Sequence, residues 1–210
     1  PSLPYNFSKT KLKNFSLFSL GSKKYGYGNF NRIKNLILIL KDSKNRLDHY
    51  SFGDRYKNKK KFLDKINYEV SLDKNIILDI TNDLFLDKKT ISILKKILTK
   101  KKNSKIFIID SPTKKNLSII LNSDHIKTLI PFEVSNKLKK ELLKIKKIKL
   151  GIDYFIYPKT YLKKGTKNYD ITLSFGASDN YKGTLYVLKI LQYLKVKRNI
   201  TVVNGKFFKQ

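Results

Sequence analysis

The stretch NFSLFSLGSKKYGYGNFNRIKNLILILK (residues 14–41) decides the fold. Its apolar residues 15–20 predict a strand, and the positions after them carry Gly21, Gly26 and Gly28. Apolar side chains then recur at helical spacing, at Phe30, Ile33, Leu36, Ile37 and Leu40. The stretch therefore predicts a strand, a glycine-rich turn and an amphipathic helix.

The glycine-rich turn has two interpretations. Glycines let the backbone approach a ligand closely, and the N–H groups that open a helix attract anions. On this interpretation Gly26 and Gly28 bind phosphate, and Asn29 lies where the N-cap of the helix is expected. On the other interpretation, the glycines form a tight turn that only lets the helix pack on the sheet.

The composition limits the class of protein. The chain has 210 residues, of which 40% are hydrophobic, so it is long and apolar enough to form a core and is not disordered. It has no cysteine and two histidines, which excludes disulfides and thiolate metal sites and leaves little for a histidine-based metal centre. We predict neither a metal nor a cofactor.

The net charge of +30 first suggests a nucleic acid or an anionic membrane as partner. Only four basic residues are arginine, however, and the 42 lysines are spread along the whole chain. Proteins that read nucleic acids rely on arginine for two-pronged contacts and on clustered charge. We therefore predict no specific nucleic-acid binding, and only weak association with polyanions or an anionic membrane surface.

The sequence has no apolar run of the roughly 18 residues that a membrane-spanning helix needs. Its first residues, PSLPYNFSKTKLKNF, also lack the apolar centre of a signal peptide. These features indicate a cytoplasmic protein. Residues 1–13 are polar and contain prolines, so we expect a frayed N-terminal lead-in.

Strand and helix patterns alternate along the rest of the first 158 residues. The runs at residues 75–81 and 105–110 are typical of buried strands, and they contain Asp79 and Asp110 at their ends. Further strands are expected at 48–54 and 117–122, and helices at 57–67, 88–102 and after Ser135. Such alternation predicts a parallel sheet with Asp79, Asp110 and the glycine loop at one edge.

The domain organisation follows from a polar, glycine-containing segment. Residues 14–158 form a Rossmann-like N-terminal domain, residues 159–168 a linker, and residues 169–210 the start of a second domain of the same class. In this second domain, a strand, the turn at residues 176–179, a helix and a final strand repeat the opening pattern. This is too little for a complete sheet, so we expect the second domain either to be incomplete or to lean on the first.

Four segments together resemble one family: GSKKYGYGNFNR, ILDITNDLFLD, IFIIDSPT and YDITLSFGASDNYKGTLYVLKIL. They are similar to the UDP-sugar hydrolases of pseudaminic acid biosynthesis and to the SpsG-like spore-coat polysaccharide proteins. Both groups resemble MurG-like glycosyltransferases with the GT-B fold of two Rossmann domains. The resemblance covers residues 15–210 and implies a nucleotide-sugar enzyme without a metal or cofactor.

The resemblance also implies roles for particular residues. The turn SFGASD places Gly176, Ser178 and Asp179 close to the diphosphate of the nucleotide. The first loop of the family reads G-x-G-H, whereas this chain has Asn29 in place of the catalytic histidine. An asparagine can orient a water molecule or bind a sugar, but it is not a general base near neutral pH.

Other side chains are candidates for the missing catalytic function. Asp79 and Asp110 could bind sugar hydroxyls or replace the base, or could simply cap the helices that follow them. Arg32 could reach a phosphate or simply pair with an aspartate at the surface, and Asn29 could be a plain N-cap. His125 could stand in for the missing histidine, although it fits an ordinary loop histidine better, as does His49.

We therefore expect an α/β, GT-B-like protein that processes a UDP-sugar, as a hydrolase or a glycosyltransferase, in surface polysaccharide or nonulosonic-acid glycan synthesis. One alternative is a catalytically degenerate homologue that binds sugar nucleotides without turning them over. A second alternative, based on charge, is a basic nucleic-acid-binding protein.

Overall fold

The structure is a computed structural model that describes residues 14–41, 45–53, 55–82, 84–99, 105–109, 125–131, 134–156, 170–175, 179 and 182–203. The chain divides into two compact units, Pro1–Pro158 and Lys159–Gln210. The lead-in at residues 1–13, the strand expected at 117–122 and the linker at 159–168 lie outside the described residues.

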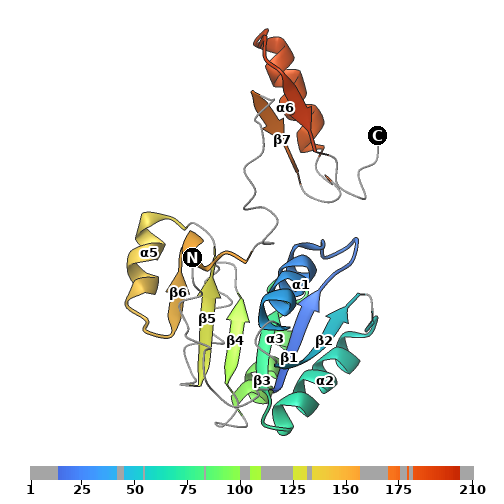
Figure 1. The fold of residues 1–210 in the computed structure, drawn as a ribbon, viewed down its shortest axis with the longest axis vertical. Helices are drawn as coiled ribbons and strands as arrows, with labels where there is room; N and C mark the ends of the chain where they lie inside the picture. Colours follow the sequence, from blue (N-terminus) through green and yellow to red (C-terminus); the bar gives the residue numbers. More distant parts are fainter. Residues whose placement is uncertain are drawn as a thin grey trace. The chain divides into compact units, whose positions relative to one another are not determined.

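The first unit is an α/β structure built on a six-stranded parallel sheet, as predicted for a Rossmann-like fold (Figure 1). Its strands lie in the order β2-β1-β3-β4-β5-β6. The elements are β1 (Asn14–Leu20), α1 (Gly28–Lys41), β2 (Arg46–Phe52), α2 (Lys59–Ser71), β3 (Asn75–Asp79), α3 (Lys88–Thr99), β4 (Ile106–Ile109), β5 (Ile126–Ile130), α5 (Asn136–Leu143), β6 (Ile148–Leu150) and the 3₁₀ turn η1 (Ile152–Tyr154).

Helices cover both faces of this sheet, because successive side chains of a strand point to opposite faces. In β1, Phe15 and Leu17 pack with the apolar side of α1. Phe18 and Leu20 point the other way, into a core shared with α2 and α3. This second core is rich in aromatic rings that meet edge to face, among them Phe18, Phe52, Phe62 and Phe85.

The strand order reverses between β1 and β3, and this reversal positions the site. From β1 the chain crosses to β2 on one side, and it then returns to β3 on the other side of β1. The helices that follow β1 and β3 pack on opposite faces of the sheet, and the carboxyl ends of strands at such a reversal are where open parallel sheets usually bind ligands. The glycine loop and Asp79 both lie there.

Several boundaries differ from those predicted. The strand expected at 48–54 is β2, Arg46–Phe52, and the helix expected at 57–67 is α2, Lys59–Ser71. Helix α3 is described as Lys88–Thr99, and residues 100–102 of the predicted helix lie outside the described residues. The predicted cap of α5 is confirmed, because the Ser135 hydroxyl accepts a hydrogen bond from the Leu138 N–H at 3.4 Å.

The described part of the second unit is a β-α-β arrangement. It contains β7 (Ile171–Leu173), α6 (Gly183–Tyr193) and β8 (Ile200–Val202), and the two strands are parallel. The strand, helix and strand predicted from the repeated opening pattern are thus present. Among the residues described in either unit, no helix combines the length and hydropathy that crossing a membrane requires.

Candidate functional site

The glycine loop between β1 and α1 is held by its own backbone and by Tyr25. The Ser22 N–H donates to the Gly26 carbonyl at 3.2 Å, and the Tyr25 N–H donates to the Ser22 hydroxyl at 3.2 Å. The Tyr25 ring packs on Phe52 and Phe85 with centroids 5.4 and 6.3 Å away. Gly26 adopts a φ of +75°, which favours glycine, and this closes the turn.

Two other glycines are explained by close packing. A Cβ on Gly21 would lie 2.9 Å from the Cβ of Phe30, so this glycine lets α1 approach β1. Gly53, after β2, has a φ of +102°, and a Cβ there would lie 2.5 Å from the Gly21 carbonyl oxygen. The packing interpretation therefore holds for Gly21, whereas the space beside Gly26 is open.

Asn29 is not the N-cap of α1, so that prediction is wrong. The helix begins at Gly28, and the Asn31 N–H already donates to the Tyr27 carbonyl at 2.9 Å. This earlier start places Asn29 inside the first turn. Its Nδ2 donates to the backbone carbonyl of Asp79 at 3.1 Å, so the side chain ties the helix to the end of β3.

Arg32 and Asp79 form a bidentate ion pair next to this turn. Nε of Arg32 donates to Oδ2 of Asp79 at 2.8 Å, and Nη2 donates to Oδ1 at 2.9 Å. The Asp79 side chain has no exposed surface, whereas that of Arg32 keeps 17%. Such a planar pair fixes the guanidinium strongly. A Cβ on Gly28 would lie 3.9 Å from Nη1 of Arg32, so the guanidinium lies beside the helix start.

The surroundings of Asp79 set its charge. Burial raises the pKa of Asp79 to about 6, although the hydrogen bonds and charge of Arg32 oppose this rise. The carboxylate is therefore mainly ionised at neutral pH. Both of its oxygens bond to Arg32 and neither meets solvent, so Asp79 orients Arg32 and does not itself reach a ligand.

The arrangement is suited to holding an anion. The first N–H groups of a helix have no partner within the helix, and the helix dipole adds partial positive charge there. At α1 these groups belong to Gly28, Asn29 and Phe30, beside the fixed cation of Arg32. No general base is available from Asn29, which is an amide, or from Asp79, which is occupied by Arg32.

Not all of the remaining candidates lie in the part of the chain that the structure describes. Asp110, Gly176 and Ser178 lie outside the described residues. Asp179, in the second unit, caps α6 by accepting from the N–H groups of Gly183 at 2.7 Å and Thr184 at 3.0 Å. His125 donates from Nε2 to the Leu98 carbonyl at 2.6 Å, in keeping with an ordinary loop histidine.

A partly buried pair next to the site was not predicted from the sequence. Oγ of Ser19, near the end of β1, lies 2.9 Å from Nε2 of His49, whose ring packs on Phe30. His49 is therefore a strand residue of β2 and not the predicted loop histidine. Ser19 has no exposed surface, so the pair supports the packing of α1 on the sheet. The sequence did indicate the burial of Ser19, because the alternation of a strand places residues 15, 17 and 19 on one face of β1.

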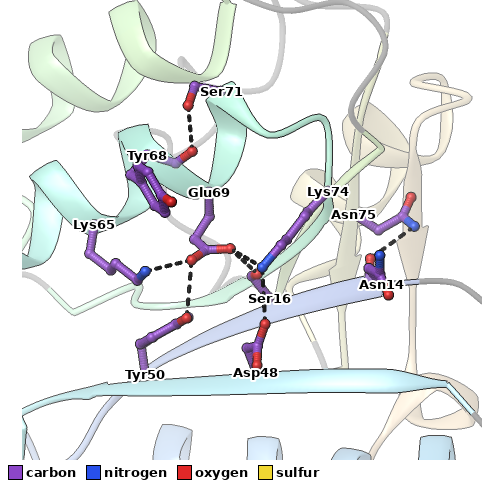
Figure 2. Close-up of polar contacts among 10 residues, drawn as sticks. All are labelled: Asn14, Ser16, Asp48, Tyr50, Lys65, Tyr68, Glu69, Ser71, Lys74 and Asn75. Atoms are coloured by element: carbon purple, nitrogen blue, oxygen red, sulfur yellow. Dashed lines mark hydrogen bonds and ion pairs between the residues drawn. The ribbon is translucent and has the colours of Figure 1, made fainter.

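A second buried carboxylate lies toward the amino ends of the same strands (Figure 2). Glu69 of α2 accepts hydrogen bonds from Ser16 at 2.7 Å and from Tyr50 at 3.0 Å. It also pairs with Lys65 at 2.6 Å and with Lys74 at 2.7 Å. Burial raises its pKa, but these four partners together lower the pKa of Glu69 to about 2.

The sequence carried a signal for this cluster. Glu69 shares the buried face of α2 with Phe62, Ile66 and Val70, where an acidic residue requires partners. All its oxygens are used within the first unit, and the cluster joins α2 to β1 and β2. It is therefore a structural cluster.

Comparison with known proteins gives no matching family model, no matching curated protein and no matching solved structure. The assignment of a function consequently depends on the residues of this chain and on the geometry of the edge that holds Arg32.

Proposed function

We propose that this chain is a nucleotide-sugar-processing protein of surface glycan synthesis, with a UDP-sugar as its partner, and that α1 contacts the phosphates. The observation that carries the proposal is the two-pronged pair by which buried Asp79 fixes Arg32 beside Gly28. This pair lies where the strand order reverses, which is the usual ligand position in open parallel sheets.

Three features favour phosphate over other ligands. The groups at the start of α1 are N–H donors, and the adjacent side chain is an arginine, whose planar fork matches phosphate oxygens. The loop before the helix is glycine-rich, and Gly26 leaves open space where a side chain would stand. The resemblance to UDP-sugar hydrolases and GT-B glycosyltransferases then supplies the class of phosphate compound and the proposed GT-B fold.

A second candidate, a homologue that binds the nucleotide sugar without turning it over, is favoured by the chemistry of the same residues. Asn29 replaces the family histidine, and Asp79 is both buried and paired. Loss of a positioned base lowers a rate by about 10²- to 10⁴-fold. Asn29→His separates the two: release of UDP at unchanged rate in this variant supports an enzyme with another base, whereas turnover only in the variant supports the binding homologue.

The proposal is tested by thermal unfolding of the whole chain with and without millimolar UDP, at near-physiological salt. A ligand at a hundred times its dissociation constant stabilises by about 2.7 kcal/mol, which gives a clear shift. We expect UDP to raise the unfolding temperature more than an equally charged polyphosphate does. Equal shifts with both compounds, or no shift, would contradict the proposal.

Two arginine variants localise the effect. Arg32→Gln removes the fixed cation and should abolish most of the UDP-induced shift, measured relative to the variant's own unliganded stability. Arg46→Gln is the matched control, because Arg46 is exposed at the amino end of β2, far along the strand from the glycine loop. Loss of the shift in both variants would show that general charge, and not Arg32, binds the nucleotide.

A further inference from the structure

The densest group of lysines in the described chain lies at the β6 edge of the sheet. Residues 137–149 contain seven lysines and one glutamate. They form α5, the turn after it and β6, which is an edge strand (Figure 1). We call the exposed part of this segment the α5 surface, and it comprises Lys137, Lys139, Lys140, Glu141, Leu143, Lys144 and Lys146.

The apolar side of α5 packs on the sheet. Leu142 is buried against Ile130 and Ile148, and Leu138 and Ile145 pack on the same cluster. By helical spacing, Lys137, Lys140 and Lys144 then follow one another along the outer side, and Lys139 and Leu143 form the neighbouring row. The helix is therefore amphipathic, with lysines flanking an exposed leucine.

The lysines of this surface outnumber its single carboxylate by five to one. None of the ion pairs among the described residues involves its five lysines. In helix α2, Lys59 pairs with Asp87 at 2.8 Å and Lys65 with Glu69 at 2.6 Å, although the exposed Lys60 and Lys61 take part in none of these pairs. The α5 surface differs in that all five of its lysines are exposed and outside these pairs, so they are available for an external anion.

We propose that the α5 surface binds the anionic headgroups of a lipid membrane. Clusters of four to eight basic residues on an amphipathic helix are typical of such binding. Leu143 leaves 59% of its surface exposed among the lysines, where it can enter the acyl boundary. A nucleic acid fits less well, because the segment contains no arginine for base or phosphate forks and no aromatic ring for stacking.

The test is sedimentation of the whole chain with phosphatidylcholine vesicles, with and without phosphatidylserine, at near-physiological salt. We expect binding only to the vesicles with phosphatidylserine. Lys137→Gln, Lys140→Gln and Lys144→Gln together should weaken it by about tenfold or more, since each lysine near an anionic surface contributes substantially. The substituted side chains are exposed, and circular dichroism checks that the fold is kept.

The matched control removes the same charge elsewhere. Lys57→Gln, Lys60→Gln and Lys61→Gln together change exposed lysines at the start of α2. Because screening limits the reach of charge to about 8 Å, this variant should lose less than about threefold. Equal losses in the two triple variants would overturn the proposal, and so would binding that does not depend on phosphatidylserine.

Leu143→Gln distinguishes a lipid from a nucleic acid. This variant should weaken vesicle binding by about threefold or more, because an apolar contact is lost, and should leave binding to duplex DNA unchanged. Duplex DNA binding that depends on the α5 lysines, together with absent vesicle binding, would assign the surface to nucleic acid and overturn the proposal. Neither result depends on the nucleotide-sugar site.

Discussion

Asp79 and Glu69 are buried carboxylates of one sheet, yet their surroundings move their pKa values in opposite directions. Glu69 accepts from two lysines and two hydroxyls, and its pKa falls to about 2. Asp79 has a single arginine as its charged partner, and burial raises its pKa to about 6. Neither side chain has more than about 1% of its surface exposed. At Glu69 the four donors together outweigh the effect of burial on the pKa, whereas at Asp79 burial outweighs the single arginine.

The difference also separates two kinds of role. The donors around Glu69 satisfy the carboxylate and join α2 to the strands, which contributes to stability. At Asp79 the carboxylate is only partly compensated, and the pair fixes an arginine beside a helix start. A costly, weakly compensated charge at the carboxyl edge of a parallel sheet is more typical of a functional position than of a structural one.

The largest expected effect is the loss of stability when Glu69, the structural carboxylate, is replaced. Glu69→Gln removes the charge that Lys65 and Lys74 share, so it should lower the free energy of unfolding by about 3 kcal/mol at pH 7, measured in urea. Glu141→Gln, at an exposed position of α5, is the control and should change stability by less than about 0.5 kcal/mol. Similar losses in the two variants would refute a structural role for the cluster.

The effect of Glu69 on stability should also depend on pH. Its pKa falls from 4.5 when unfolded to about 2 when folded, so its contribution is complete above pH 4.5 and is lost as the pH falls toward 2. The difference between the wild type and Glu69→Gln should therefore shrink over this window. A difference that stays constant would contradict the assignment.

A somewhat smaller effect of opposite sign is expected at Asp79. Its pKa rises from 3.8 to about 6, so the folded state binds the extra proton and Asp79 costs stability as the pH rises through this window. Relative to the wild type, Asp79→Asn should gain about 2 to 3 kcal/mol between pH 4 and pH 7. Urea unfolding across this range measures the gain, and a loss would show that Arg32 outweighs burial.

Gly53 and Gly26 allow the cost of a steric clash to be compared with the cost of backbone strain alone. Gly53→Ala introduces a Cβ 2.5 Å from a backbone oxygen at a φ of +102°, and should cost about 2 kcal/mol or more. Gly26→Ala meets open space at a φ of +75°, and should cost about 1 kcal/mol through backbone strain alone. Thermal unfolding ranks the two, and equal costs would mean that Gly53 has no packing role.

The smallest effect concerns a buried hydroxyl that lacks a hydrogen-bond partner among the described residues. Oγ1 of Thr128 on β5 has no hydrogen-bond partner within the described part of the chain, and the residue has no exposed surface. Thr128→Val keeps the shape and removes the unsatisfied hydroxyl, so it should stabilise by about 1 kcal/mol. Thr90→Val is the comparison, because the Thr90 hydroxyl accepts from Lys59 at 3.3 Å and its loss should destabilise.

The sequence predicted the α/β class because alternating apolar runs and amphipathic segments leave few other architectures. It also placed Asp79 and the glycine loop at one edge, since parallel strands share their carboxyl ends. It did not predict that α1 begins at Gly28, because several polar residues near Asn29 could each have capped the helix. That boundary determines whether Asn29 caps the helix or bonds to β3.

Partners that are distant in the sequence were also beyond prediction. Glu69 bonds to Ser16 across 53 positions, and Arg32 to Asp79 across 47. Nothing in local spacing selects Ser16 as the partner of Glu69 or Asp79 as the partner of Arg32, and only the strand order β2-β1-β3 brings them together. The order in which strands pair is a property of the folded sheet.

The most direct test of the account is a UDP titration of the ¹⁵N-labelled chain, followed by backbone amide NMR at near-physiological salt. We expect the largest chemical-shift changes at the amides of Gly26, Gly28 and Asn29, and no change at the amides of Lys65 and Glu69. Shifts spread evenly over lysine-rich surfaces, or centred on Glu69, would contradict the claim that the carboxyl edge of the sheet holds the phosphate site.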